Sequence, residues 1–82
     1  MNSETNETKE VIRLGLNYTE GAIQEFETIA YRLWDAAGHP DTPQRFRARV
    51  QYIGNVLAEA ANDAKRALTD LAYLSEELKE GD

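Results

Sequence analysis

The chain has 82 residues, no cysteine and a single histidine, and its nine basic and fifteen acidic residues give a net charge of −6. This length allows one small domain, and the composition excludes disulfides and thiolate sites and argues against a histidine-rich metal site. The acidic balance argues against broad contact with phosphate backbones or with an anionic membrane surface. Because no run of 18 apolar residues and no signal-peptide pattern is present, we expect a cytoplasmic protein.

Polarity and charge divide the chain unevenly. Residues 1–9 contain no apolar residue after Met1, so we predict an acidic flexible tail there and a single domain over residues 10–80. The net charge is −4 over residues 1–27, +2 over residues 28–52 and −4 over residues 53–82. The molecule is therefore acidic at both ends of the chain and mildly basic in the middle.

The stretch over residues 10–16 supports two interpretations. Its apolar residues alternate with other residues, which is typical of a strand, although part of the stretch continues the spacing of the helix that follows. Gly15 is a poor interior helix residue, and Asn17 followed by Glu20 has the form of a helix N-cap. We therefore predict a short extended segment followed by a helix that begins near Tyr18.

Two helices joined by a short turn are predicted after this segment. The first covers residues 18–37, where apolar residues repeat at intervals of three and four: Thr19, Ile23, Phe26, Ala30, Leu33 and Ala37. In the turn, Gly38 suits the left-handed residue after a helix, Pro40 stops the helix and Thr42 can cap the next one. A connection this short makes the two helices antiparallel neighbours.

The second helix is predicted to be unusually long, over residues 43–79. Its apolar stripe alternates intervals of four and three without a break: Phe46, Val50, Ile53, Leu57, Ala60, Ala64, Ala67, Leu71, Leu74 and Leu78. Such a stripe is the seam of a helix that packs on other helices. The predicted fold is all-α, an antiparallel two-helix hairpin that dimerises into a four-helix bundle.

The dimer is predicted because a first helix that begins near residue 18 covers only half of the second. Beyond residue 60 the stripe has no helical partner within the chain, so either the segment at residues 10–16 or a second copy must cover it. An uncovered apolar stripe of this length usually marks an interface. The predicted dimer interface comprises Gly54, Ala60, Ala64, Ala67, Leu68, Leu71, Leu74 and Leu78.

No catalytic constellation is apparent in the sequence. The two serines lie near the chain ends, the one histidine lies in the turn with Asp35 and Asp41 nearby, and no phosphate-binding glycine loop is present. We expect no enzyme activity, no cofactor and no metal site. A basic group near the turn suggests a binding surface for an acidic protein or for nucleic acid, although charge balance and packing over apolar surface also explain it. It comprises Tyr31, Arg32, Arg45, Arg47, Arg49 and Tyr52.

The stretch from Ile12 to Ala22, Ile-Arg-Leu-Gly-Leu-Asn-Tyr-Thr-Glu-Gly-Ala, resembles the opening of a family of short acidic pseudomonad proteins of unknown function. In that family an extended segment with a Gly-Leu-Ser-type N-cap leads into two helices, whereas this chain has Asn17 in place of Ser and a longer second helix. The size, charge and lack of a catalytic set are also similar to small phage-encoded proteins that inhibit host machinery. Both resemblances imply a binding role.

We therefore expect a non-catalytic, homodimeric interaction protein that binds another protein as an inhibitor or adaptor. Two alternatives involve nucleic acid. A strand at residues 10–16 before two helices has the order of a ribbon-helix-helix regulator, although acidic flanks repel phosphate and the second helix is too long. An acidic DNA mimic is the other, although the acids are interleaved with bases.

Overall fold

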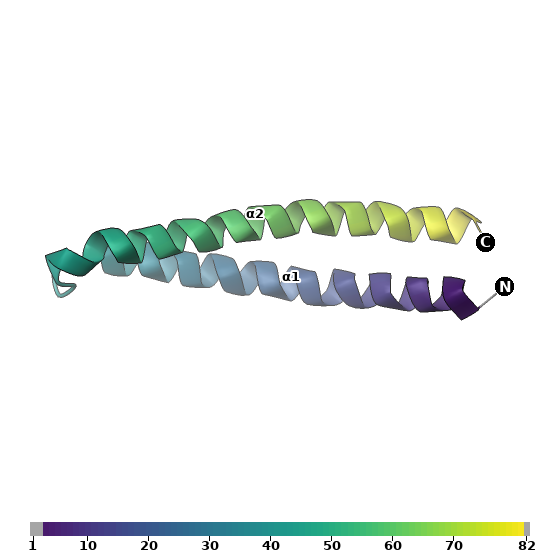
Figure 1. Ribbon diagram of the computed structural model, residues 1–82, viewed down its shortest axis with the longest axis horizontal. Helices are drawn as coiled ribbons and strands as arrows, with labels where there is room; N and C mark the ends of the chain where they lie inside the picture. Colours follow the sequence, from purple (N-terminus) through teal and green to yellow (C-terminus); the bar gives the residue numbers. More distant parts are fainter. Residues whose placement is uncertain (1–2, 82) are drawn as a thin grey trace.

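The protein is a long helical hairpin, seen in a computed structural model that describes residues 3–81 (Figure 1). Helix α1 spans Ser3–Ala37 and helix α2 spans Gln44–Gly81, and the two lie side by side in antiparallel orientation. The hairpin measures 60 × 16 × 13 Å, with the turn at one end and both chain ends at the other. No strand occurs among the described residues, and the predicted all-α hairpin with a long second helix is confirmed.

Helix α1 begins at Ser3, so the prediction of an extended segment at residues 10–16 and a start near Tyr18 is wrong. Gly15, which argued against a helix, lies inside α1 and faces α2: a Cβ there would sit 3.1 Å from Cδ1 of Leu71. The glycine costs the helix about 1 kcal/mol, and the close approach of Leu71 offsets that cost. Residues 3–9 of the predicted tail belong to α1. Their flexibility stays a prediction, and residues 1–2 lie outside the described part of the chain.

Helix α1 ends at Ala37 as predicted, but the turn after it is built differently. The Gly38 amide donates to the carbonyl oxygens of Trp34 and Asp35 at 3.3 and 3.2 Å, and the His39 amide donates to Ala36 at 3.1 Å. No residue in the described part of the chain has a positive φ, so the left-handed conformation predicted for Gly38 is wrong. The chain instead leaves α1 through tightening helical turns, which need no left-handed residue.

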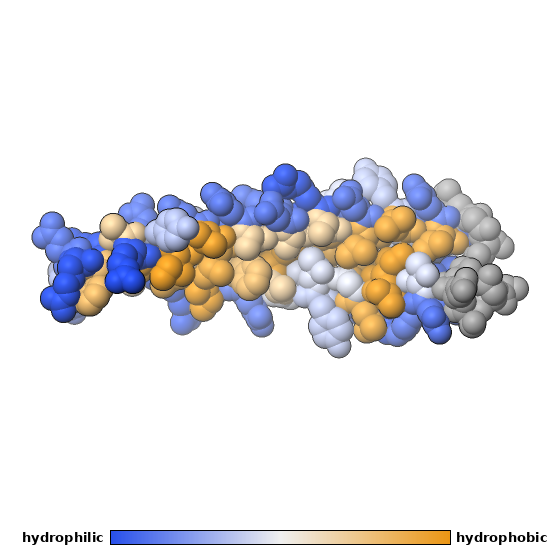
Figure 2. Space-filling model, viewed as in Figure 1, coloured by the Kyte–Doolittle hydropathy of each residue, from blue (hydrophilic) through white to orange (hydrophobic). Residues whose placement is uncertain are grey.

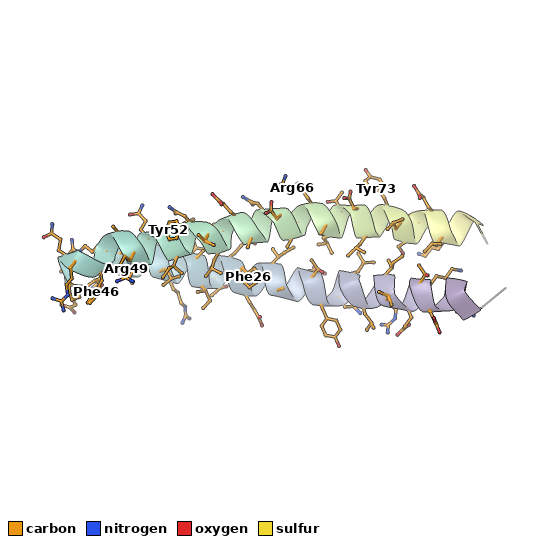
Figure 3. The ribbon with its side chains drawn as sticks, viewed as in Figure 1. Phe26, Phe46, Arg49, Tyr52, Arg66 and Tyr73 are labelled. Carbon is orange, nitrogen blue, oxygen red and sulfur yellow. The ribbon has the colours of Figure 1, made fainter. Side chains whose placement is uncertain are left out.

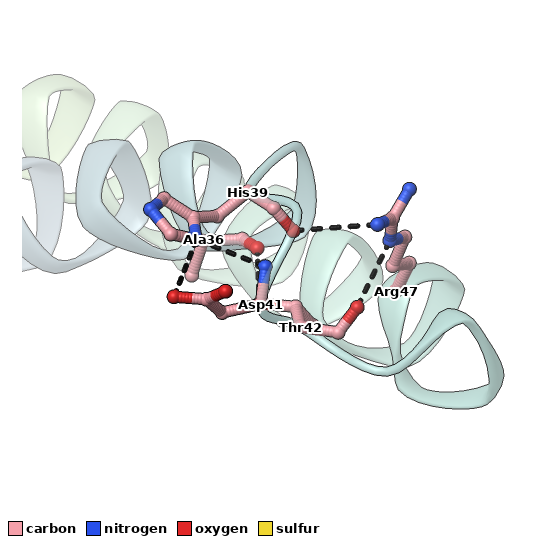
Figure 4. A network of polar contacts seen from close by, with 5 residues as sticks. All are labelled: Ala36, His39, Asp41, Thr42 and Arg47. Atoms are coloured by element: carbon pink, nitrogen blue, oxygen red, sulfur yellow. Dashed lines mark hydrogen bonds and ion pairs between the residues drawn. The ribbon is translucent and has the colours of Figure 1, made fainter.

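Thr42 and Arg47 hold the turn closed (Figure 4). Instead of capping the start of α2, the Thr42 hydroxyl donates to the Ala36 carbonyl oxygen at 2.6 Å, across the turn. Arg47 donates from Nε to the Thr42 carbonyl at 3.1 Å and from a terminal nitrogen to the His39 carbonyl at 3.4 Å. These bonds satisfy carbonyl groups that a helix end and a loop leave unpaired.

The core between the helices is thin and is built largely from small residues. The buried apolar residues are Ile12, Ile23, Ala30, Ala37 and Ala61, and no large side chain among the described residues is fully buried. Gly54 of α2 is also buried, and a Cβ there would lie 2.7 Å from Nε1 of Trp34 and 3.3 Å from the Ala30 carbonyl oxygen. Small residues thus let the helices approach closely, at the expense of buried apolar area.

Candidate protein-interaction surface

Helix α2 carries three neighbouring rows of residues with a spacing of seven, and they differ in exposure. The first row is buried or half-buried throughout and holds Arg47, Gly54, Ala61, Leu68 and Ser75. The middle row is half-buried throughout and holds Val50, Leu57, Ala64, Leu71 and Leu78. The third row is exposed except for the half-buried Ala60, and holds Phe46, Ile53, Ala60, Ala67 and Leu74. Of the first row, Gly54 and Ala61 are the buried members.

The rows correct the predicted seam. The seam predicted from the sequence consists of the middle row and the apolar third row. In the structure, α1 instead packs on the middle row and the first row. The physical reason is that Gly54 and Ala61 admit the backbone and the indole of α1, so the helix pair closes on its smallest residues. The third row is left open along the flank of α2.

This open flank joins an apolar flank of α1 to form one continuous surface, which we name the apolar face. It comprises Phe26 and Ile29 of α1 with Phe46, Ile53, Val56 and Leu74 of α2. These side chains keep between 36% and 50% of their surface exposed. Figure 2 shows apolar side chains in a band along the hairpin, bordered by hydrophilic ones. Exposed apolar surface rimmed by polar residues is typical of a protein–protein interaction site.

The total surface area indicates that the hairpin is incompletely buried. The chain exposes 6323 Å², whereas a compact monomer of 9.3 kDa exposes about 5,000 Å² on the usual scaling of area with mass. The excess of about 1,300 Å² is larger than the roughly 800 Å² that each partner buries in an interface of standard size. An elongated hairpin of 60 × 16 × 13 Å exposes more surface than a compact monomer of the same mass, and the apolar face is part of that surface.

The residues predicted to form a dimer interface divide into two groups. Because α1 extends to Ser3, the second half of α2 is not uncovered, and the premise of that prediction is wrong. Five of the residues are buried or half-buried in the hairpin: Gly54, Ala64, Leu68, Leu71 and Leu78. The other three belong to the third row: Ala60 is half-buried, Ala67 is exposed, and Leu74 is part of the apolar face. Whether any of the eight contacts a second copy stays a prediction.

The six residues predicted to bind a partner do not form one patch. Arg47 is bonded to the turn, and the guanidinium of Arg45 lies over the Phe46 ring, 4.6 Å from its centroid. Arg49 and Tyr52 line one shallow hollow on α2 with Ala48 and Ile53. Figure 3 shows Arg49 and Tyr52 on the same stretch of α2, next to the turn. Arg32 and Tyr31 are exposed on α1, and a role for any of these side chains in binding stays a prediction.

A second hollow lies along the opposite side of the helix pair, and its contacts are structural. It is lined by Glu27, Ala30, Tyr31 and Trp34 of α1 and by Ala58, Asn62 and Lys65 of α2. Trp34 donates from Nε1 to Oδ1 of Asn55 at 2.9 Å, and the Tyr31 ring meets its edge at a centroid distance of 5.6 Å. Lys65 and Glu27 form an ion pair at 3.3 Å between the helices. These contacts lock the indole over Gly54 and fix the register of the hairpin.

Ionisable side chains form contacts near both ends of the hairpin, between Arg13 and Glu10 and in the turn. Arg13 donates from Nε to Glu10 at 3.1 Å, and this bond, with the charge of the guanidinium, lowers the pKa of Glu10 and raises that of Arg13. Both side chains are exposed, so the pair contributes little to stability. In the turn, the Asp41 amide donates to Nδ1 of His39 at 3.1 Å. The Asp41 carboxylate at 3.7 Å from it becomes an ion-pair partner only when His39 is protonated.

Neither a metal-binding group nor a membrane-spanning helix occurs in the part of the chain that the structure describes. No three histidine or carboxylate side chains of residues 3–81 converge on a point, and neither helix has a stretch that is apolar enough to cross a bilayer. The strand on which the ribbon-helix-helix alternative depended is α-helix. Comparisons with protein families, with curated proteins and with solved structures find no match to this chain. The resemblances to pseudomonad and phage proteins therefore stay predictions.

Sequence reasoning missed the two-helix character of the interaction surface. Of the six members of the apolar face, only Leu74 was predicted as a site residue; Phe26, Ile29, Phe46, Ile53 and Val56 were not. The signal was present, because Ile29 widens the apolar arc of α1 beyond a single seam, and Val56 does the same for α2. A helix with an arc that wide has apolar surface left over after it packs on one partner.

Proposed function

We propose that this protein is a non-catalytic interaction module that works as a homodimer and binds another protein as an inhibitor or adaptor. The single observation that supports the proposal is the apolar face, a surface built from both helices and left open by the hairpin. A second copy provides an identical apolar face, and two such faces together make the core of a four-helix bundle. Among residues 3–81, no group of histidine or carboxylate side chains is placed to hold a metal.

The exposed area sets the expected strength of this dimer. Complete burial of a large apolar side chain contributes about 1.5–3 kcal/mol, so the half-exposed side chains of the apolar face each contribute about 1 kcal/mol. Six side chains from each copy give about 12 kcal/mol, against an association cost of about 4–15 kcal/mol. At the lowest association cost, about 4 kcal/mol, the net is about −8 kcal/mol, so the tightest dimer that we expect has a dissociation constant of about 1 µM.

Ile53→Glu tests the proposal, because Ile53 is the most exposed member of the apolar face. The change removes about 1 kcal/mol of burial from each copy and places a carboxylate against apolar surface. We expect the dissociation constant, measured by dilution calorimetry, to rise at least about 100-fold, which is about 2.7 kcal/mol. Gln51→Glu is the matched control, since it makes the same change in charge at an exposed residue about 200° around the helix. Equal dissociation constants for the two variants would contradict the proposal.

The basic end of the hairpin is the surface that we propose for an acidic partner protein. Arg32 and Arg45 are exposed there, and the guanidinium of Arg45 borders the apolar face over the Phe46 ring. The test is capture from a cell lysate on immobilised protein. An acidic protein retained by the wild type should be lost from the double variant Arg32→Ala, Arg45→Ala. Arg66→Ala is the control, because it removes an exposed arginine that pairs with Asp63 in the middle of α2. Retention by the double variant would exclude the basic end as the binding surface.

A further inference from the structure

The hairpin carries opposite charges at its two ends. The turn end, residues 32–49, carries four arginines and two aspartates, a net charge of +2. At the open end, residues 3–14 carry three acidic and two basic residues, and residues 70–81 carry four acidic and one basic residue. The open end is therefore at −4, and it lies at the opposite end of a molecule 60 Å long (Figure 1).

Two symmetric dimers bring the apolar faces together. In one, the two-fold axis runs along the hairpin, each turn lies beside the other turn, and α2 stacks on α1 of the second copy. In the other, the axis crosses the hairpin, each turn lies beside the open end of its partner, and α2 stacks on α2. The first places +2 beside +2 and −4 beside −4, and the second places +2 beside −4 at both ends. Because like charges in contact are destabilising, the charges favour the second.

The side chains that border the apolar face of α2 follow the same pattern. A row with a spacing of seven flanks the third row and reads Arg49, Val56, Asp63, Asp70 and Glu77. When two α2 helices cross antiparallel near their middles, Arg49 of one lies opposite the stretch that holds Asp70 and Glu77 of the other. Neighbouring copies of the third row then place Phe46 by Leu74, Ile53 by Ala67, and Ala60 by Ala60. The two large side chains, Phe46 and Leu74, meet away from the crossing, and Ile53 meets a small residue. Two alanines meet at the crossing itself, which allows the helices to approach closely.

We infer that the apolar face is occupied by a second copy of this chain in antiparallel orientation, with each arginine-bearing turn beside the acidic open end of its partner. The inference rests on the proposed function, since it requires that the copies pair. It adds the orientation, the stacking of α2 on α2 and the role of Arg49 at the rim. It also separates the two turn ends, so a dimer presents its two basic surfaces at opposite ends of the bundle.

A distance between two spin labels tests the orientation. The chain has no cysteine, so Gln44→Cys gives one nitroxide per copy at the exposed start of α2, away from the apolar face. In the antiparallel dimer, pulsed dipolar spectroscopy on the full chain should give a distance of about 45–60 Å between the two labels. This is the distance along α2 from residue 44 to the crossing near residue 60, at a rise of about 1.5 Å per residue, taken once for each copy. In the dimer whose turns lie side by side, the distance between the labels is less than about 30 Å, which is about three helix diameters. Asn62→Cys, an exposed residue at mid-helix, is the control, since it gives less than about 30 Å in both arrangements.

Each outcome has one meaning. A long distance at residue 44 with a short one at residue 62 supports the antiparallel dimer. Short distances at both residues overturn the orientation and leave the dimer intact. No dipolar coupling at either residue means that the copies do not pair, which overturns the proposed dimer as well. If a label perturbs pairing, sedimentation of the labelled protein shows a mass below that of the dimer. The salt dependence of dimerisation of the unlabelled protein provides a second readout. Rising salt weakens the antiparallel dimer by several-fold and strengthens one with like charges together.

Discussion

The packing of α1 on α2 predicts that alanine substitutions at three glycines of the hairpin have graded effects on stability. Glycine in a helix interior costs about 0.5–1 kcal/mol relative to alanine, so the same gain is available at each site. What differs is the space that a new Cβ enters. At Gly21 no atom lies within 4 Å, at Gly15 the end of the Leu71 side chain lies at 3.1 Å, and at Gly54 the Trp34 ring lies at 2.7 and 2.8 Å.

The expected magnitudes follow from these contacts. Gly21→Ala should stabilise the protein by about 0.5–1 kcal/mol. Gly15→Ala should be near neutral, because the Leu71 methyl groups are mobile and can shift. Gly54→Ala should destabilise by about 1–3.5 kcal/mol: overpacking costs about 1–3 kcal/mol, displacing Trp34 breaks its bond to Asn55, worth about 1 kcal/mol, and the helix gains about 0.5–1 kcal/mol. The Ala30 carbonyl oxygen at 3.3 Å limits any shift of the backbone.

Thermal and urea unfolding followed by circular dichroism at one fixed protein concentration measures the series. For a domain of this size, about 1 kcal/mol corresponds to a shift of about 4–8 °C in Tm. We expect the order Gly21→Ala, Gly15→Ala, Gly54→Ala from most to least stable, with the wild type between the first and the last. Equal stabilisation by all three substitutions would mean that Gly54 and Trp34 do not pack together, and would refute the register of the hairpin.

Three further predictions concern the turn, the open end and the rim. Arg47→Ala should lower the free energy of unfolding by about 1 kcal/mol or more, because it removes both bonds to the turn carbonyls. Arg45→Ala is the control. Equal effects of the two substitutions in urea unfolding would contradict the role of Arg47. Arg13→Ala should raise the pKa of Glu10 toward its ordinary value in an NMR titration, since Arg13 is what lowers it. The lowered pKa makes the small stabilisation by this pair present above the unfolded-state pKa of Glu10 and lost as pH falls through the folded-state value; an unchanged titration of Glu10 in the variant would rule out the pair. Arg49→Glu should weaken dimerisation about tenfold at low salt and less at high salt, as measured by calorimetry. The reason is that salt screens an ion pair at the rim and weakens its attraction. A salt-independent effect would argue against charge pairing at Arg49.

The hairpin itself was predictable because its signals are local and repeated. The break at residues 38–43 combines glycine and proline between two long apolar repeats, and the apolar spacing of α2 continues without interruption. The start of α1 was not predictable in the same way. Gly15 and the alternation around it favour an extended segment when only neighbouring residues are considered. The fact that decides for helix is the contact of Gly15 with Leu71, which is 56 residues away.

The candidate site shows the same limit. Periodicity placed the apolar surface of α2 but could not say which flank of it α1 would cover. That choice depends on whether large or small residues meet between the helices, and here Gly54 under Trp34 and the buried Ala61 decide it. Ile53, Val56 and Leu74 are left outside as a consequence. The arginines near the turn could be listed from the sequence, but only the bonds of Arg47 to the turn carbonyls separate a structural arginine from the exposed Arg32 and Arg45.

The central claim, that the apolar face is closed by a second copy, is tested most directly by the mass of the wild-type protein in solution. Sedimentation equilibrium at about 50 µM, above the dissociation constant of about 1 µM expected for the tightest dimer, should return twice the chain mass of 9.3 kDa. The mass should fall toward that of one chain on dilution and for Ile53→Glu. A wild-type mass of 9.3 kDa at that concentration would contradict the account.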